Sequence, residues 1–307
     1  MIMSCFAIGG FTASAAEASG NVSAAAAEPA GTGQFAQDTI QGGNVLHCFN
    51  WTYNNIRSNL ADIAAAGYTA VQTSPVQQAK DYSSGYTTLG NEWWKLYQPL
   101  TLSVAASGTS YLGSPRELRM LCQDAHDLGI KVIADIVANH VANNGTEGGG
   151  YALVHPDVEE DLQDPTYYHT STSYISDTNR RTMTQNHMKM PDLNTGDAYI
   201  QERVLGLLKE CVDFGVDGFR FDAAKHIELP TDDASFASDF WPTVINGIKD
   251  YKSDVFVYGE ILGTAGTDIS NYTQYMNITD DSVSNNVRGA VYTNTPSASN
   301  LANHTYG

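Results

Sequence analysis

Two charged side chains interrupt an apolar, strand-like run in the second half of the chain. In Gly218–Asp222, Arg220 and Asp222 stand two positions apart, between phenylalanines. Side chains alternate along a strand, so the two charged residues share one face and the phenylalanines pack on the other. A neighbouring guanidinium favours the ionised carboxylate, which suits a nucleophile. The alternative is an internal salt bridge, and we prefer the nucleophile because Lys225 and His226 follow at the same strand end.

A second carboxylate ends the next apolar run, where Val255 to Gly259 leads into Glu260 and then Ile261. Apolar surroundings raise the pKa of a glutamate, as a general acid near neutral pH requires. Neighbouring parallel strands lie about 4.8 Å apart. Two carboxyl groups at their ends would then approach the separation of about 5 to 5.5 Å that is typical of retaining glycosidases. The alternative for Glu260 is a helix cap.

Two polar segments bracket a stretch rich in Gly, Asp, His, Tyr and Thr. Asp135 and Asn139 share a strand face while His140 points the other way, and Asp192 lies at the far end of the stretch. An oxygen ligand from each end, from Asn139 and Asp192, could clamp an inserted subdomain to the main fold through Ca²⁺. The alternative is a turn asparagine and a helix-capping aspartate.

An aromatic cluster, Glu92 to Pro99, contains Trp94, Tyr97 and Gln98. Aromatic faces with a hydrogen-bonding amide suit sugars, whose ring faces are apolar and whose edges carry hydroxyls. Buried core aromatics are the competing interpretation. The position after a predicted second strand makes the sugar site as well supported as the core cluster, because functional loops of a barrel follow its strands.

These segments need a fold that brings strand ends together. Short β-rich runs alternate with helical stretches, which is typical of a parallel sheet with crossover helices. We predict a (β/α)8 barrel rather than an open doubly wound sheet, because no GxGxxG or Walker-type loop follows the first strand. The alternating runs are Val45–Phe49, Ile56–Ala66, Ala70–Thr73, Arg116–Leu128, Val132–Val137, Tyr199–Phe214, Gly218–Phe221, Phe236–Tyr251, Val255–Tyr258, Asn271–Ile278 and Val283–Tyr292.

Composition limits the partners. The 307 residues include 34 acidic and 16 basic side chains, a formal charge of −18. This charge repels nucleic acid and acidic membrane surfaces and leaves a neutral polysaccharide unaffected. We interpret Cys48, Cys122 and Cys211 as buried thiols, since they lie in or beside apolar runs.

The first 38 residues are predicted to be a leader. An apolar stretch ends in small residues that suit signal-peptidase cleavage, yet the first basic residue is Arg57, so we expect that the true N-terminus is missing. The Ala/Gly-rich part that follows has too little apolar surface to offset the conformational entropy lost on ordering, so we predict that it is disordered. No other run is long enough to span a membrane, so we expect the mature chain to be soluble. The signal-like start leads us to expect secretion, and we expect a monomer.

Together these segments resemble glycoside hydrolase family 13, the alpha-amylase family, and most of all its secreted bacterial alpha-amylases. The likeness runs from about Gln41 to the end. The segments that carry it are Asp135 to His140 (D-x-V-x-N-H), Met190 to Thr195 (L-P-D-L-N), Gly218 to His226 (G-x-R-x-D-A-x-K-H) and Tyr258 to Leu262 (G-E), with support from Gln72 to Pro75 and Leu96 to Pro99.

The resemblance implies retaining endo-hydrolysis of alpha-1,4-glucans such as starch. It implies Asp222 as nucleophile, Glu260 as acid/base and Arg220 as the partner of Asp222. The implied sugar-binding residues are Tyr97, Gln98, His140, Lys225 and His226, to which we add Trp94 from the aromatic cluster. The implied Ca²⁺ ligands are Asn139, Asp192 and the backbone carbonyl of His226.

One departure concerns a third carboxylate, an aspartate of an H-D pair that the family carries after the seventh strand. No His-Asp pair follows Glu260. We therefore expect a record cut short after about six of eight strands, inactive as it stands. The predicted domains are a leader (1–38), a first barrel part (39–140), an inserted calcium-binding subdomain (141–195) and an incomplete second barrel part (196–307).

Rival functions remain open. A glucanotransferase, an alpha-glucosidase or a debranching enzyme of the same family would share both carboxylates. A non-catalytic carbohydrate-binding relative would lose Asp222 or Glu260, and both are present. A metal-dependent amidohydrolase barrel requires an H-x-H pair on the first strand, where this chain has His47-Cys48-Phe49.

Overall fold

The computed structural model describes residues 40–80, 91–145, 153–263 and 269–280, all within the compact unit Ala36–Gly307. Six parallel strands form one sheet in the order in which they occur along the chain. They are β1 (Val45–His47), β2 (Ala70–Pro75), β5 (Lys131–Val137), β6 (Gly218–Asp222), β7 (Phe256–Gly259) and β8 (Asn277–Ile278). A doubly wound sheet reverses its strand order at a switch point, and this sheet does not. The fold is a partial (β/α)8 barrel, as the sequence predicted.

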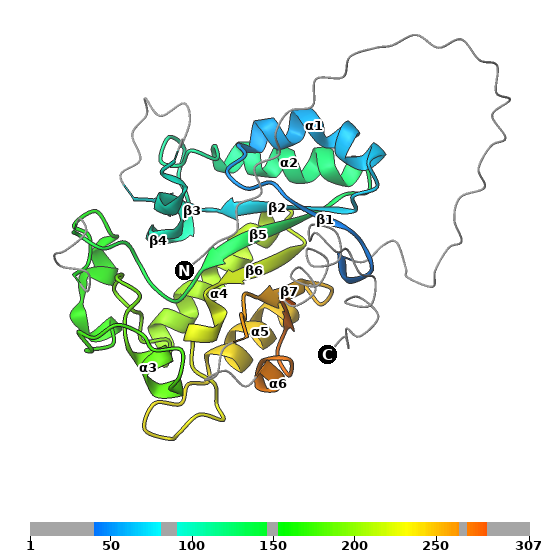
Figure 1. Cartoon of the computed structure of the whole chain (residues 1–307). Helices are drawn as coiled ribbons and strands as arrows, with labels where there is room; N and C mark the ends of the chain where they lie inside the picture. The colour runs from blue at the N-terminus through cyan, green and yellow to red at the C-terminus, as the bar shows by residue number, and fades with distance from the viewer. Residues whose placement is uncertain (1–39, 81–90, 146–152, 264–268, 281–307) are drawn as a thin grey trace, which may run out of the picture. The chain divides into compact units, whose positions relative to one another are not determined.

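Four long helices connect these strands (Figure 1). They are α1 (Tyr53–Ala65), α2 (Pro115–Asp127), α4 (Ala198–Asp213) and α5 (Phe240–Tyr251). Capping marks the starts of α1 and α2: the Thr52 side chain accepts the Asn55 N–H, and Ser114 and Glu117 form a reciprocal capping box before α2. Pairs of these helices, α1 with α2 and α4 with α5, pack against each other outside the sheet.

The central strands are buried on both faces, as in other parallel sheets. Phe219 and Phe221 of β6 point outward into the core, where the Phe221 ring meets Trp241 of α5 edge-on at 5.2 Å. This packing confirms the predicted alternation, and it leaves Arg220 and Asp222 on the inner face. Cys48, Cys122 and Cys211 are buried free thiols, also as predicted.

Two segments extend the sheet's carboxyl end. An antiparallel pair, β3 (Gln77–Ala79) and β4 (Pro99–Val104), follows β2 and flanks the 3₁₀ turn η2 (Trp93–Tyr97). The second segment, between β5 and α4, contains η3 (Glu160–Gln163), η4 (Pro165–Tyr167) and the short helix α3 (Arg180–Gln185), and is drawn in green in Figure 1. We call it the insertion; its predicted limits as a domain, 141–195, stay a prediction.

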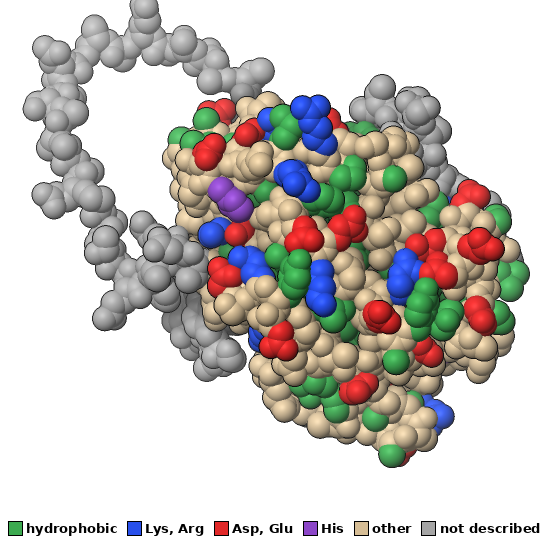
Figure 2. All heavy atoms as spheres, turned by 180° about the vertical axis from the view of Figure 1, so that it is seen from behind, with side chains coloured by type: hydrophobic (Ala, Val, Ile, Leu, Met, Phe, Trp, Pro, Cys, Tyr) green, Lys and Arg blue, Asp and Glu red, His purple; other side chains and the backbone are tan. Residues whose placement is uncertain are grey.

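The last part of the alternation differs from the prediction. In the predicted alternation of strands and helices, the run Asn271–Ile278 takes the place of a helix. The structure has only the end of helix α6 (Ile269–Tyr272) there, followed by strand β8. The run Val283–Tyr292, the leader 1–38 and Cys5 lie outside the described residues. None of the helices in the described ranges is long and apolar enough to cross a membrane. Figure 2 shows acidic side chains spread over one face with basic ones among them, rather than gathered in one patch.

Candidate active site

Arg220 lies at the centre of three carboxyl groups. Its Nη1 donates to both oxygens of Asp135 at 2.8 and 2.9 Å and to Asp222 Oδ1 at 2.9 Å, while Nη2 lies 2.9 Å from Glu260 Oε2. The Arg220, Asp135 and Asp222 side chains are buried, and 15% of the Glu260 side-chain surface is exposed to solvent. The three predicted catalytic residues are thus brought together, with Asp135 as a further member.

Strand register explains the meeting. Parallel pairing sets Asp135 of β5 directly opposite Arg220 of β6. Phe221 pairs with Gly259 of β7, and the Glu260 N–H donates to the Phe221 carbonyl at 2.9 Å. Asp222 and Glu260 therefore leave the carboxyl ends of neighbouring strands, the face where barrel active sites lie.

The turn after β6 adds a backbone donor. Ala223 has a left-handed conformation, φ 51°, which costs an L-residue about 1 to 2 kcal/mol. In this conformation its N–H donates to Glu260 Oε2 at 3.1 Å. The turn thus fixes the carboxyl of Glu260 relative to the end of the Asp222 strand.

Burial and the like charges set the ionisation of this cluster. Burial raises the pKa of Asp222 to about 6, although the Arg220 guanidinium beside it acts in the opposite direction. A group with a pKa near 6 is still about nine-tenths ionised at pH 7. Burial, with the Asp222 charge, also raises the pKa of Glu260 above its ordinary value. The raised pKa suits Glu260 as a general acid, whereas Asp222 can act as a nucleophile because it is still mostly ionised at pH 7.

Two buried polar atoms near the cluster have no hydrogen-bond partner among the described residues. One is Nδ1 of His140, whose Nε2 hydrogen bonds to the Tyr97 carbonyl oxygen at 2.9 Å. Burial lowers the pKa of His140 to about 4, so the ring is neutral and Nδ1 is an acceptor. The other is Oε1 of Gln98. The Tyr97 hydroxyl donates to Asp135 Oδ2 at 3.1 Å, which ties Tyr97 to the Arg220 cluster.

The remaining predicted sugar-binding residues lie in two places. Lys225 and His226 are buried in the turn η5 (Ala224–His226) that follows Asp222, and Lys225 Nζ pairs with Asp177 of the insertion at 3.0 Å. Trp94 is 39% exposed, with Lys95 Nζ 5.7 Å from the centre of its ring. Its neighbour Trp93 packs instead against Phe49 and Tyr97.

Two of the three predicted calcium ligands are in contact. Asn139 Nδ2 donates to Asp192 Oδ1 at 2.8 Å, where the insertion leaves and rejoins the barrel. His226 makes no hydrogen bond to either within the described ranges; its Nδ1 binds the Met183 carbonyl oxygen at 2.9 Å. The described residues hold no group of three or more His, Cys, Asp or Glu side chains arranged as a metal site.

Known proteins resemble this chain over most of its length. The family model described as alpha amylase, catalytic domain, matches residues 55–299. The chain belongs to the alpha-amylase family. An alpha-amylase of Clostridium acetobutylicum is 39% identical over 258 residues, 83% of this chain and 32% of that protein. One of Butyrivibrio fibrisolvens is 35% identical over 78% of this chain and 26% of its own length. The chain thus spans about a third or less of these two family members.

Solved structures of the family share the fold. Alpha-amylase I from Eisenia fetida, in a mutant complex with maltohexaose, superposes with a TM-score of 0.67 at 22% identity, over 85% of this chain and 54% of that one. The alpha-amylase from Geobacillus thermoleovorans, complexed with acarbose, gives 0.62 at 18% identity, over 82% and 54%. At such identities the likeness supports the barrel, and function rests on the site.

The candidate site includes residues to which the sequence gave no role. Asp135 belongs to the recognised motif, and its strand parity with Asn139 already turned it inward. His169 of the insertion was not noticed: its ring lies 2.7 Å from Asp192 Oδ2 and 3.2 Å from Glu228 Oε1. No local pattern marks His169, because its partners lie 23 and 59 positions away in the sequence.

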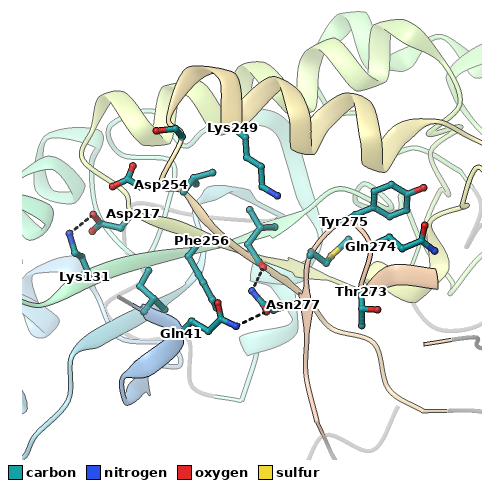
Figure 3. A pocket seen from close by; sticks show the side chains of 15 residues that line it. Gln41, Lys131, Asp217, Lys249, Asp254, Phe256, Thr273, Gln274, Tyr275 and Asn277 are labelled. Atoms are coloured by element: carbon teal, nitrogen blue, oxygen red, sulfur yellow. Dashed lines mark hydrogen bonds and ion pairs between the residues drawn. The ribbon is translucent and has the colours of Figure 1, made fainter. Parts of the chain in front are cut away.

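One cavity lies away from this cluster. It has a volume of about 580 Å³ and opens at the amino ends of β5, β6 and β7, where Lys131, Asp217 and Phe256 line it (Figure 3). Lys131 Nζ pairs with Asp217 Oδ1 at 3.4 Å. Residues at this end of a barrel serve stability rather than catalysis. The Arg220 cluster therefore remains the candidate active site.

Proposed function

We propose that this chain carries the catalytic carboxylates of a retaining alpha-1,4-glucan hydrolase. The observation that carries the proposal is that one guanidinium, Arg220, holds Asp222 and Glu260 at the ends of adjacent barrel strands. In a retaining glycosidase two carboxyl groups flank the bond that is cleaved. Membership of the alpha-amylase family supports an alpha-glucan as the substrate.

The proposed reaction has two steps. Asp222 attacks the anomeric carbon and forms a covalent glycosyl ester as the glycosidic bond breaks, while the protonated Glu260 donates its proton to the departing oxygen. Water then attacks the anomeric carbon, ionised Glu260 takes up the water proton, and the bond from that carbon to Asp222 breaks, which frees the carboxylate. The raised pKa of Glu260 favours its protonated form before the first step. Arg220 keeps Asp222 oriented in both steps.

Sugar binding is assigned to the unsatisfied groups around the cluster. A sugar hydroxyl that donates to His140 Nδ1 or Gln98 Oε1 would satisfy a buried acceptor. Tyr97 presents its ring beside them, and exposed Trp94 offers a stacking surface farther out. Lys225 and His226 lie in the turn after the nucleophile and are assigned to the leaving-group side.

Calcium is the proposed cofactor, at the junction of insertion and barrel. The donor set fits: Asn139 Oδ1 accepts no hydrogen bond within the described ranges, and Asp192 is a buried carboxyl. Burial raises the pKa of Asp192 well above its ordinary value, so a cation there would restore the carboxylate. Asn139, Asp192 and the His226 carbonyl would hold the ion, which would join the insertion to the barrel.

The proposal includes a secreted monomer that acts on starch or glycogen without nucleic-acid or membrane partners. Endo-cleavage is proposed over the activity of a glucanotransferase, alpha-glucosidase or debranching enzyme, because the two relatives that are 39% and 35% identical are named alpha-amylases. Solved glucanotransferases share the fold at only 18 to 19% identity. Fractionation of a native culture tests secretion, and sedimentation tests the monomer. Activity found only in the washed cells would contradict secretion. A sedimentation coefficient of a dimer would contradict the monomer.

Starch hydrolysis by the full-length protein tests the reaction, with product anomers followed by NMR. We expect alpha-configured oligosaccharides from the wild type and a loss of kcat of at least about 10³-fold in Asp222→Asn and Glu260→Gln. Initial beta-configured products would contradict the retaining mechanism. Starch binding without cleavage would favour a non-catalytic carbohydrate-binding protein instead.

A further inference from the structure

The turn that carries Lys225 and His226 is held through its backbone carbonyls. The Lys225 oxygen accepts hydrogen bonds from Arg180 Nη1 at 2.8 Å and from the Tyr272 hydroxyl at 3.0 Å. The Ile227 oxygen accepts from Arg180 Nη2 at 3.0 Å and also lies 3.0 Å from the Tyr272 hydroxyl, whose single proton the two carbonyls share. The same two side chains therefore grip the carbonyl on either side of His226.

Asp232 and the Tyr272 ring hold the Arg180 side chain in the orientation that these hydrogen bonds require. Its Nε and Nη2 donate to Asp232 at 2.8 to 3.1 Å, and its guanidinium carbon lies 5.5 Å from the centre of the Tyr272 ring. Asp232 in turn accepts the Leu229 N–H at 2.8 Å. Nε and both terminal nitrogens of the guanidinium are thus engaged. A planar fork can address two carbonyls and a carboxylate together, which a lysine ammonium cannot reproduce.

The contact joins three separate parts of the fold. Arg180 begins helix α3 of the insertion, the gripped turn follows strand β6, and Tyr272 ends helix α6 beyond strand β7. The insertion holds the turn at two more points, through Asp177 with Lys225 and the Met183 carbonyl with His226. The turn also supplies the Ala223 N–H that binds Glu260.

We propose that Arg180 is a positioning residue that sets the leaving-group side of the active site, in concert with Tyr272. The inference rests on the proposed glucan hydrolysis and deepens it. Arg180 does not contact the substrate. It fixes the turn, and the turn sets the positions of the Lys225 and His226 side chains relative to the leaving-group sugar. A displacement of about 1 Å in such groups lowers rates by up to about 10²-fold.

Two substrates of the full-length protein separate positioning from general damage. Maltohexaose has sugars on both sides of the cleaved bond, whereas a 4-nitrophenyl alpha-maltotrioside has only a small aryl leaving group. In Arg180→Met and Arg180→Lys we expect kcat/KM for maltohexaose to fall at least about tenfold more than kcat/KM for the aryl glycoside. The bond positions cleaved in maltohexaose should also shift.

Arg181→Met is the matched control. Arg181 is the next residue of the same helix, is exposed, and contacts Ser235 and Phe236. It should leave both rates unchanged. Tyr272→Phe keeps the ring and removes the hydroxyl from both carbonyls, so it should reproduce the substrate selectivity of the Arg180 variants. It also decides the question if those variants do not fold.

The outcomes are distinguishable. Equal losses on both substrates in Arg180→Lys and Tyr272→Phe would overturn the positioning role and leave a structural one, and so would unchanged rates. A wild-type protein that cleaves neither substrate would instead overturn the proposed function on which the inference rests.

Discussion

Arg220 Nη1 lies 2.8 Å from Oδ1 and 2.9 Å from Oδ2 of Asp135, a carboxyl with no exposed surface. Asp135 thereby anchors the guanidinium from strand β5, and the same guanidinium reaches Asp222 and Glu260 on the other side. One cation serves three carboxyl groups, so the fully ionised cluster carries excess negative charge. This excess, added to burial, accounts for the raised pKa values of Asp222 and Glu260.

Removing the cation should destabilise the protein in a pH-dependent way. Arg220→Met leaves three carboxyl groups without their partner, and breaking a buried pair costs about 3 to 5 kcal/mol of unfolding free energy. We expect that loss at pH 8. At pH 5 the loss should be smaller, because the carboxyl groups whose pKa values are raised take up protons. Urea denaturation at the two pH values measures both.

Arg57→Met provides a surface control for Arg220→Met. Arg57 pairs with Asp124 at 2.7 Å, but the side chains keep 22% and 45% of their surface exposed. Such pairs contribute about 0 to 1 kcal/mol. A loss in Arg220→Met no larger than in Arg57→Met, or one that does not change with pH, would contradict the charge account.

Asp222→Asn should stabilise the fold at high pH while abolishing activity. The folded pKa of Asp222, about 6, exceeds its ordinary value of 3.8, so the folded state binds the extra proton between these values. Its contribution to wild-type stability is present below pH 4 and is lost as pH rises through 6. Asparagine does not ionise. At pH 8 we expect Asp222→Asn to exceed the wild type by at most roughly 3 kcal/mol.

Thermal melts at pH 4 and pH 8 check this expectation for Asp222→Asn. The Tm difference from the wild type should be near zero at pH 4 and positive at pH 8. A variant that is less stable than the wild type at pH 8 would mean that the ion pair with Arg220 outweighs the burial of the charge.

What the sequence predicted depended on how local the signal was. The two-residue alternation in β6 placed Arg220 and Asp222 inward because period-two patterning needs no distant partner. The grip of Asp135 on Arg220 depends on the register between β5 and β6, strands separated by more than 80 residues, so local patterning gave Asp135 no role.

Other features lacked any local signal. Strand β8 has two residues and α6 has four, too few in either to show a periodicity, so the run Asn271–Ile278 gave no sign that it contains a helix end and a strand. Arg180 reaches carbonyls 45 and 47 positions away, and backbone acceptors leave no mark in sequence composition. The family motifs identified the chemistry, whereas the parts that position it required tertiary structure.

Gly215→Ala should destabilise the turn between α4 and β6. Gly215 has φ +103°, and a Cβ there would lie 2.8 Å from Cys122 Cβ. We expect a loss of roughly 2 to 5 kcal/mol, from backbone strain of about 1 to 2 kcal/mol and overpacking of about 1 to 3 kcal/mol. Gly67→Ala is the control: its φ is +86° with nothing within 4 Å, so only strain applies. Equal losses in urea denaturation would exclude the clash with Cys122.

Calcium should raise thermal stability through Asp192. A ligand at 100 times its Kd stabilises the folded state by about 2.7 kcal/mol. We expect the wild-type Tm to fall on chelation with EGTA and to recover with added Ca²⁺, and we expect Asp192→Ala and Asn139→Ala to lose this response. Asp254→Ala, which removes a 75% exposed carboxylate paired with Lys252, should keep it. Recovery that persists in Asp192→Ala would place the cation elsewhere, and a wild type indifferent to EGTA would remove calcium from the proposal.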